Sequence, residues 1–210
     1  MLFSSYERHK KGESLHVVVD STGLKVFGEG EWKVRQHGYS KRRTWRKLHL
    51  GVDEASGEVV ASVLSTNNVG DSEVLPDLLQ QVQDPIHQIS ADGAYDTFGC
   101  HAAIAARNAS AAIPPRENAC IAQHGNSNDP PLPRDEILRA IREKGMKSWK
   151  QDSHYHRRSL AETAMYRFKQ LLGRTLSART FENQSAEAFI KCTAMNRMIR
   201  LGMPDSYALV

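Results

Sequence analysis

The first half of the chain carries short runs of β-branched and apolar residues that alternate with turn-forming segments. Residues 15-LHVVVD-20 form one such run, which ends at an aspartate and is typical of a buried strand. Two more strands are expected at 45–53 and 58–65, and the turn chemistry of 53-DEASG-57 between them predicts an antiparallel hairpin. A fourth strand is expected at 86–92, also ending at an aspartate, and a short fifth at 109–115.

Apolar residues at helical spacing lie between and after these strands. We expect a helix over 71–82, capped by Asp71 or Ser72, and a second over 97–108, capped by Asp96. The last third predicts three more, at 134–144 with Gly145 ending it, around 155–169, and at 185–201. This order of elements predicts an α/β fold, with a mixed sheet flanked by helices on both faces.

The length of 210 residues suits one domain with its own core. We expect it to span residues 15–206, with short tails at 1–14 and 207–210, and a long loop or small insertion at 114–133, where Pro, Asn, Ser and Gly accumulate. The three cysteines show no CxxC spacing, so neither a disulfide framework nor a zinc knuckle is indicated. No run suits a signal peptide or a membrane span, which predicts a cytoplasmic protein without a membrane partner.

Positive charge is concentrated in one segment of the chain. The formal net charge is +4 and the sequence pI is about 9.0, which permits an anionic partner. The segment 41-KRRTWRK-47 holds five cations in seven residues. A solvated hairpin or loop explains it as well as contact with nucleic acid does. The candidate DNA contacts are Lys41, Arg42, Arg43, Arg46 and Lys47.

Carboxylates follow two of the expected strands. Asp20 and Asp92 both stand at strand ends, and in α/β sheets the carboxyl ends of strands border the crevice that binds ligands. Two carboxylates side by side repel each other unless a cation lies between them, and oxygen ligands favour Mg²⁺ or Mn²⁺. Glu162, from a helix packed against the sheet, is the candidate third ligand of a two-metal site that acts on a phosphodiester. The alternative role of each aspartate is a turn or cap.

Four polar residues around Glu162 share one helical stripe. At about 100° per residue, Tyr155, Arg158, Glu162 and Lys169 fall within an arc of roughly 60°. The opposite, core-facing side would carry Leu160, Ala164, Phe168 and Leu171. A solvated face is the alternative, with a capping box over residues 159–162 and an i,i+4 ion pair. Trp149, just before the stripe, is expected in the core rather than stacked on an extruded base.

The same four residues resemble the Y-x2-R-x3-E-x6-K signature of bacterial insertion-sequence transposases with a DDE catalytic triad. The segments 20-DSTGLKVFGEGEW-32, 38-GYSKRRTWRKLHLGVDE-54, 67-NNVGDSE-73, 91-ADGAYD-96 and 158-RSLAETAMYRFKQLLG-173 resemble the insertion-sequence-five family, within the superfamily named after insertion sequence four. The resemblance extends from about residue 15 to residue 206. It implies a ribonuclease-H-like fold in which Asp20, Asp92 and Glu162 are catalytic and hold Mg²⁺, or Mn²⁺ in its place, as two ions.

The resemblance also implies what the protein does. A transposase of this kind nicks the ends of its element and joins the exposed 3′ hydroxyl to target DNA, with Tyr155, Arg158 and Lys169 on the phosphates. Its partner would be double-stranded DNA, bound as a homodimer at the bacterial nucleoid. Family members usually carry a DNA-binding region ahead of the first aspartate, and here 19 residues precede Asp20. The alternatives are a nuclease of the same fold without strand transfer, and an inactive remnant that only binds DNA or dimerises.

Overall fold

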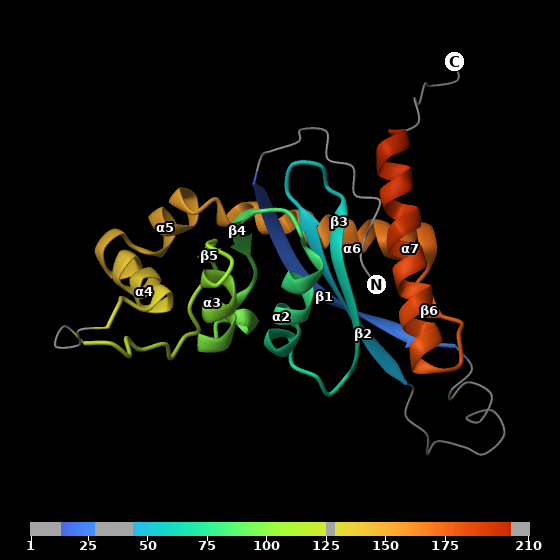
Figure 1. Ribbon diagram of the computed structural model, residues 1–210, viewed down its shortest axis with the longest axis horizontal. Helices are drawn as coiled ribbons and strands as arrows, with labels where there is room; N and C mark the ends of the chain where they lie inside the picture. Colours follow the sequence, from blue (N-terminus) through green and yellow to red (C-terminus); the bar gives the residue numbers. More distant parts are fainter. Residues whose placement is uncertain (1–13, 28–43, 125–128, 203–210) are drawn as a thin grey trace.

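The centre of the molecule is a mixed β-sheet (Figure 1). The computed structural model describes residues 14–27, 44–124 and 129–202, and within them the sheet has six strands in the order β3-β2-β1-β4-β5, with β6 paired to β1. Strand β2 is antiparallel to both of its neighbours, β1 and β3, whereas β1 pairs in parallel with β4 and β6, and β4 pairs in parallel with β5. The strands are β1 (Leu15–Val26), β2 (Trp45–Asp53), β3 (Val59–Thr66), β4 (Ile86–Ser90), β5 (Ser110–Ala112) and β6 (Thr175–Leu176).

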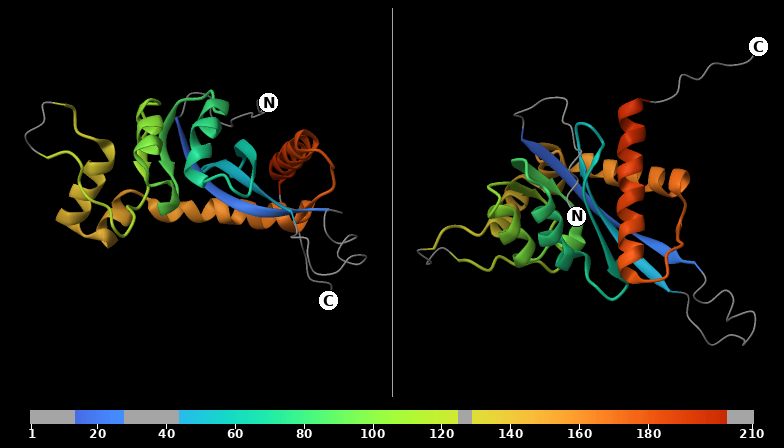
Figure 2. Two further views of the ribbon diagram at one scale, coloured as in Figure 1. Left: turned by 90° about the horizontal axis from the view of Figure 1, so that it is seen from below. Right: turned by 45° about the vertical axis from the view of Figure 1, so that its right-hand side comes forward.

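Six α-helices of the described chain flank this sheet. They are α2 (Asp71–Gln81), α3 (Phe98–Ala105), α4 (Pro133–Lys144), α5 (Met146–Asp152), α6 (Ser159–Leu172) and α7 (Phe181–Leu201). Two 3₁₀ helices, η1 (Gly93–Tyr95) and η2 (Tyr155–Arg158), precede α3 and α6. Figure 2 shows α2 and α3 on one side of the strands and α6 on the other. The expected α/β architecture is confirmed, and it is consistent with a ribonuclease-H-like fold.

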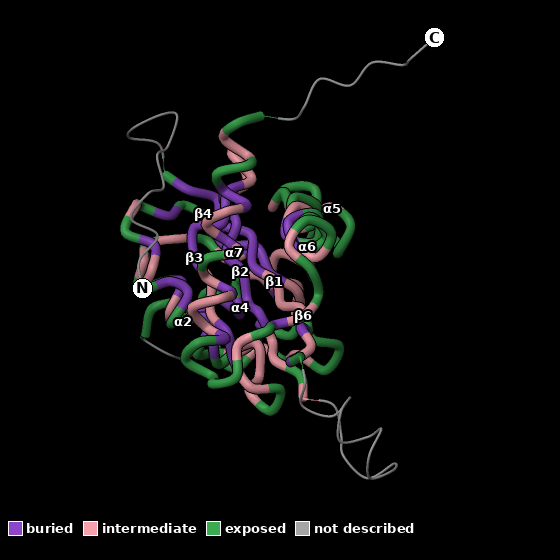
Figure 3. Tube along the Cα trace, turned by 90° about the vertical axis from the view of Figure 1, so that its right-hand side faces the viewer, coloured by how far each residue is buried: buried purple, intermediate pink, exposed green. Residues whose placement is uncertain are grey.

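The alternation of side chains along β1 divides the core into two layers. Val17 and Val19 pack with α2 and α3, while Val18 and Leu24 pack with α6 and α7. Phe168 of α6 is fully buried in the second layer. Figure 3 shows the buried strands between these layers and the exposed outer side of α6. Any side chain on the even-numbered face of β1 therefore points toward α6.

The prediction that the first strand ends at Asp20 is wrong. Strand β1 continues to Val26 because Ser21 to Lys25 stay paired with β2, in a register that runs from Ser21 opposite His49 to Lys25 opposite Trp45. The far end of β1 also pairs with β6. Asp20 thus lies inside a continuous strand, although its parallel neighbour β4 has already ended.

Two predicted helix caps are also wrong, because α2 begins after Gly70 and α3 after Thr97. Gly70 is the N-cap of α2, and its own N–H donates to Glu73 at 2.8 Å. Thr97 caps α3 by accepting from the Cys100 N–H at 3.2 Å. Asp96 does not cap α3 because its carboxylate binds Arg134. The capping box over residues 159–162 does not form, since the Glu162 carboxylate accepts from Arg158 instead.

The expected polar stripe is split between two elements. Tyr155 and Arg158 belong to η2, and only Glu162 and Lys169 belong to α6. On the opposite side Ala164 and Phe168 are buried as expected, while Leu160 is partly buried. Leu171 is not in the core: it is 57% exposed, beside the groove between the ends of α6 and α7.

Candidate active site

The register of β1 and β4 places Asp20 and Asp92 side by side. The last parallel pair is Val18 opposite Ser90, and each aspartate stands two residues beyond it. Neighbouring strands lie about 4.8 Å apart. Asp20 and Asp92 therefore lie near each other at the point where β4 ends and β1 continues, and the charge of Asp92 acts on Asp20.

Both aspartates lie on the side of the sheet that α6 and η2 cover. Asp20 is opposite Leu50, which belongs to the core layer formed with α6. The 3₁₀ helix η2 packs against both β1 and β4. This packing brings Tyr155 and Arg158 to the strand ends from a point more than 60 residues later in the chain than Asp92.

Each aspartate uses one oxygen to bind the backbone. Asp20 Oδ1 accepts from the Ser21 N–H at 2.8 Å. Asp92 is the N-cap of η1, and its Oδ1 accepts from the Ala94 N–H at 2.9 Å. These bonds fix the direction of both side chains, and in each case they use only Oδ1.

Arg158 lies between the carboxylates of Asp20 and Glu162. Its Nη2 donates to Glu162 Oε1 at 2.6 Å, and its Nη1 is 3.7 Å from Asp20 Oδ2. Its guanidinium is 5.9 Å from the centre of the Tyr155 ring. One cation therefore connects a strand carboxylate, a helix carboxylate and a phenol.

The pKa shifts show that these groups share one electrostatic environment. Burial raises the pKa of Asp20, and the carboxylates of Asp92 and Glu162 add to the rise against the Ser21 N–H and Arg158. Burial also raises the pKa of Tyr155, which Arg158 opposes. For Arg158, burial acts to lower the pKa, but the nearby phenol and carboxylates raise it overall. The negative charge of Asp20 is thus only partly compensated by Arg158.

The residues present suit a hard divalent cation such as Mg²⁺, since every donor is a carboxylate oxygen. Within residues 14–27, 44–124 and 129–202, no three His, Cys, Asp or Glu side chains lie close enough to hold a metal ion as they stand. The Glu162 side chain is 54% exposed and pairs with Arg158, so a shared metal ion would require it to turn away from Arg158 and toward the aspartates. A cation there would also relieve the burial of Asp20 as an anion.

A comparison with protein families identifies the family of the chain. A family model described as a transposase DDE domain matches residues 11–197. The chain belongs to this family. Membership implies that the transposase domain catalyses DNA transposition, with DNA as its substrate and a divalent metal ion as its cofactor. The match includes all three carboxylates of the site and the residues of η2 and α6.

Trp149 and Lys150 support Tyr155 in the transposase domain. Trp149 is buried, as expected, and its ring centre is 6.1 Å from that of Tyr155. Lys150 Nζ is 5.3 Å from the Tyr155 ring centre. Tyr155 thus has an aromatic and a cationic neighbour from α5. Lys169 is partly exposed on α6. Because it lies seven residues after Glu162, it is about two turns further along the same side of the helix.

The basic segment of the transposase domain divides into two parts. Lys41, Arg42 and Arg43 lie outside the described residues. Arg46 Nε donates to Gln184 at 2.9 Å, and Lys47 Nζ contacts Val69 O at 2.9 Å and Asp71 at 3.1 Å. Both side chains contact the protein itself, and their part in DNA binding stays a prediction.

Sequence reasoning assigned no role to Arg116 or Arg134, and only a cap to Asp96. The structure joins all three next to Asp92. Their separations of 20 and 38 residues from Asp96 follow no local period, so the spacing of residues carried no signal for this contact.

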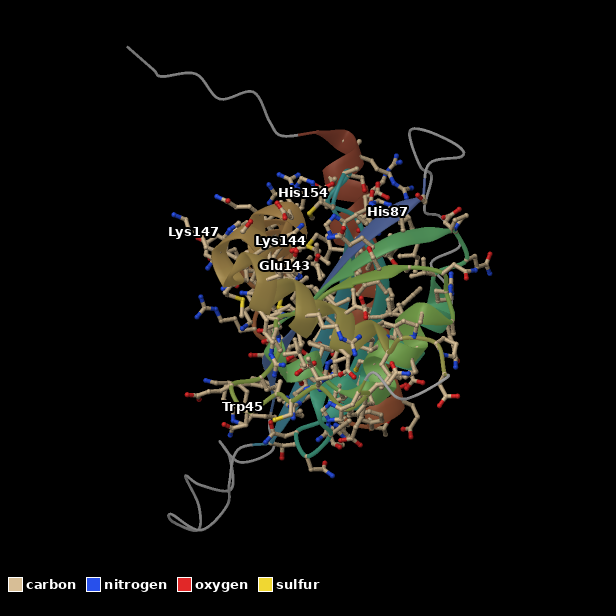
Figure 4. All side chains as sticks on the ribbon, turned by 90° about the vertical axis from the view of Figure 1, so that its left-hand side faces the viewer. Trp45, His87, Glu143, Lys144, Lys147 and His154 are labelled. Atoms are coloured by element: carbon tan, nitrogen blue, oxygen red, sulfur yellow. The ribbon has the colours of Figure 1, made fainter. Side chains whose placement is uncertain are left out.

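The part of the domain formed by α4 and α5 carries further exposed charges. Figure 4 shows Glu143, Lys144, Lys147 and His154 together around α4 and α5, well away from Trp45. Separately, no helix in the described ranges is long and apolar enough to cross a membrane.

Proposed function

We propose that this transposase domain cuts DNA at the ends of an insertion sequence and transfers the exposed 3′ hydroxyl into target DNA. Asp20, Asp92 and Glu162 would hold the metal, as two Mg²⁺ ions for which Mn²⁺ can substitute. Bound there, the ions would activate a water or a 3′ hydroxyl and stabilise the leaving oxygen. The observation that supports the proposal is that Arg158 links Asp20 to Glu162, while the parallel pairing of β1 and β4 sets Asp92 beside Asp20.

Arg158, Tyr155 and Lys169 would bind the phosphates of the transposon end. Arg158 forms ion pairs with both Asp20 and Glu162. A metal ion on these carboxylates would free the guanidinium for a phosphate oxygen, which it binds with charge-assisted, bidentate hydrogen bonds. Metal and DNA should therefore strengthen each other's binding.

The finer assignment rests on the signature. The Y-x2-R-x3-E-x6-K spacing and the surrounding segments are similar to the insertion-sequence-five family, so we place the domain there. Transposition joins two DNA ends, and a homodimer on DNA would supply one site for each end. The domain proper would span residues 15–206.

The test uses the purified chain, Mn²⁺ and duplexes taken from the DNA that flanks its gene. Wild type should cut the duplex, and a duplex with a pre-cut 3′ end should be joined to a target plasmid. Glu162→Gln should lose both reactions while its circular dichroism stays unchanged. Glu143→Gln, exposed on α4, is the matched control and should keep both.

Three outcomes separate the functions. Retained cleavage by Glu162→Gln would remove Glu162 from the site. Cleavage by wild type without joining of the pre-cut end would favour a nuclease of the same fold. DNA binding without either reaction would favour an inactive remnant.

A further inference from the structure

The two aspartates differ in how the fold supports them. Asp20 lies inside β1 and is paired across to Leu50. Asp92 stands beyond the end of β4, at the start of a 3₁₀ helix of three residues. No strand pairing fixes Asp92, so its direction depends on what holds η1.

Arg116 holds the backbone of η1 from the outside. Its Nε donates to the Gly93 carbonyl at 3.1 Å and its Nη2 to the Ala94 carbonyl at 2.8 Å. The chain just before Arg116 is also close, because a Cβ on Gly93 would lie 3.4 Å from the Pro114 carbonyl oxygen. The segment that follows β5 thus packs directly along the turn.

One peptide group connects Arg116 to Asp92. The Gly93 carbonyl and the Ala94 N–H belong to the same planar peptide unit. Arg116 binds its oxygen, and Asp92 Oδ1 binds its N–H at 2.9 Å. A cation on the carbonyl polarises the peptide and strengthens the bond that its N–H donates. This bond leaves Asp92 Oδ2 for a metal ion.

The far end of the turn is anchored separately. Asp96 is buried and binds both Nε and Nη2 of Arg134, at 2.8 and 2.9 Å. Its Oδ2 also accepts from the Arg116 backbone N–H at 2.9 Å. The Arg116 side chain therefore acts on a turn whose end is already fixed, and its effect is confined to the peptides next to Asp92.

We propose that Arg116 is a positioning residue that orients Asp92 for the metal through the 93–94 peptide. The inference rests on the proposed function, since it concerns the same metal site. The Arg116 residue is exposed, so its replacement leaves the core intact. Groups that orient a metal ligand in this way typically contribute a factor of about 10 to 100 in metal affinity.

The experiment compares Mn²⁺ binding by calorimetry in wild type, Arg116→Gln and Arg116→Lys. Arg116→Gln should weaken Mn²⁺ binding by about 10-fold, and Arg116→Lys should recover part of the loss because it restores the charge. Arg107→Gln is the control, since Arg107 makes the same kind of contact with the carbonyls of Leu79 and Val82, at 2.7 Å each, away from the site. It should lower the melting temperature and leave Mn²⁺ affinity unchanged.

Hydrogen exchange in the metal-free protein gives a second measurement. Amides in the peptide 92–97 should exchange faster in Arg116→Gln than in wild type, and at the wild-type rate in Arg107→Gln. Mn²⁺ affinity within about 2-fold of wild type, together with unchanged exchange at 92–97, would overturn the inference. If wild type binds no Mn²⁺ even with a short duplex present, the proposed function fails, and the exchange rates alone decide whether Arg116 holds the turn.

Discussion

Replacing Arg134 by Met should strongly destabilise the domain. Arg134 donates two hydrogen bonds to Asp96, and the two side chains are 10% and 1% exposed. Met fills similar space without the charge, and so it leaves a buried carboxylate with only His101 and the Arg116 N–H as partners. Removing one partner of a buried ion pair costs about 3–5 kcal/mol.

The pH dependence gives this prediction a second test. Burial acts to raise the pKa of Asp96, but the hydrogen bonds from His101, Arg134 and the Arg116 N–H lower it well below its usual range. A lowered pKa stabilises the fold above the unfolded value of about 3.9, and this stabilisation is lost as the pH falls below it. Without Arg134 fewer groups oppose the effect of burial, so the pKa of Asp96 should rise in the variant and a proton should bind more readily as the pH falls. The destabilisation should therefore be smaller at pH 5 than at pH 7.

Urea unfolding followed by circular dichroism measures both effects. Arg139→Met is the control, because Arg139, on the same helix, makes an ion pair with Glu136 and one hydrogen bond to the Gln123 carbonyl at 2.8 Å, which together are worth about 1–2 kcal/mol. Adding Asp96→Asn to Arg134→Met should recover stability, since it removes the uncompensated charge. A loss at pH 7 equal to that of Arg139→Met would refute the reasoning.

Three further predictions concern the site, the core and the DNA surface. Asp20→Asn should raise the melting temperature of the metal-free domain, and this gain should grow from pH 4 to pH 8. The reason is that the pKa of Asp20 is raised in the folded state, so the wild type loses stability as the pH rises and Asp20 ionises. A variant that melts below the wild type at pH 8 would contradict this prediction. Phe168→Ala should lower the free energy of unfolding, measured in urea, by about 3–5 kcal/mol, because Phe168 is fully buried. Leu171→Ala should lower it by about 0.5 kcal/mol or less, because Leu171 is 57% exposed. Similar losses in the two variants would show that the core is misassigned. A triple variant in the basic segment should bind DNA with a weaker salt dependence; it combines Lys41→Ala, Arg42→Ala and Arg43→Ala. The slope of log affinity for DNA against log salt concentration should fall in magnitude by about 2–3. An unchanged slope would exclude this segment from the DNA contact.

The elements with local signals were predicted well. The β2–β3 hairpin follows from its turn residues, and the end of α4 from Gly145, which adopts a φ of 82° that L side chains rarely take. The extension of β1 had no such signal. It depends on pairing with β2 along Ser21 to Lys25 and, at its last two residues, with β6, which lies about 150 positions later in the chain.

The polar stripe shows a similar limit. His154 adopts a left-handed conformation, with φ 52° and ψ 28°, which separates α5 from η2. The stripe then starts in η2, a 3₁₀ helix with about 3 residues per turn, so a single α-helical period across residues 155–169 could not represent it. The side-chain types still indicated the right neighbours, because η2 leads directly into α6 and Arg158 pairs with Glu162.

The candidate site was predictable in its carboxylates and not in its supports. Asp20 and Asp92 were recognisable because each follows an apolar run. The parallel pairing of these two runs, as β1 and β4, then places the two aspartates side by side. The contact of Arg158 with Asp20 and of Arg116 with Gly93 depends on loop paths that sequence periodicity does not encode.

Calorimetric titration with Mn²⁺ tests the central claim most directly. Wild type is compared with the double variant Asp20→Asn, Asp92→Asn, and with Asp77→Asn, Glu143→Gln as an exposed control pair. Each protein is titrated alone and with a short duplex, so that DNA phosphates can complete the metal site. The account predicts that wild type and the control pair bind Mn²⁺ and that the double variant does not. Identical binding by all three, with every protein folded by circular dichroism, would contradict it.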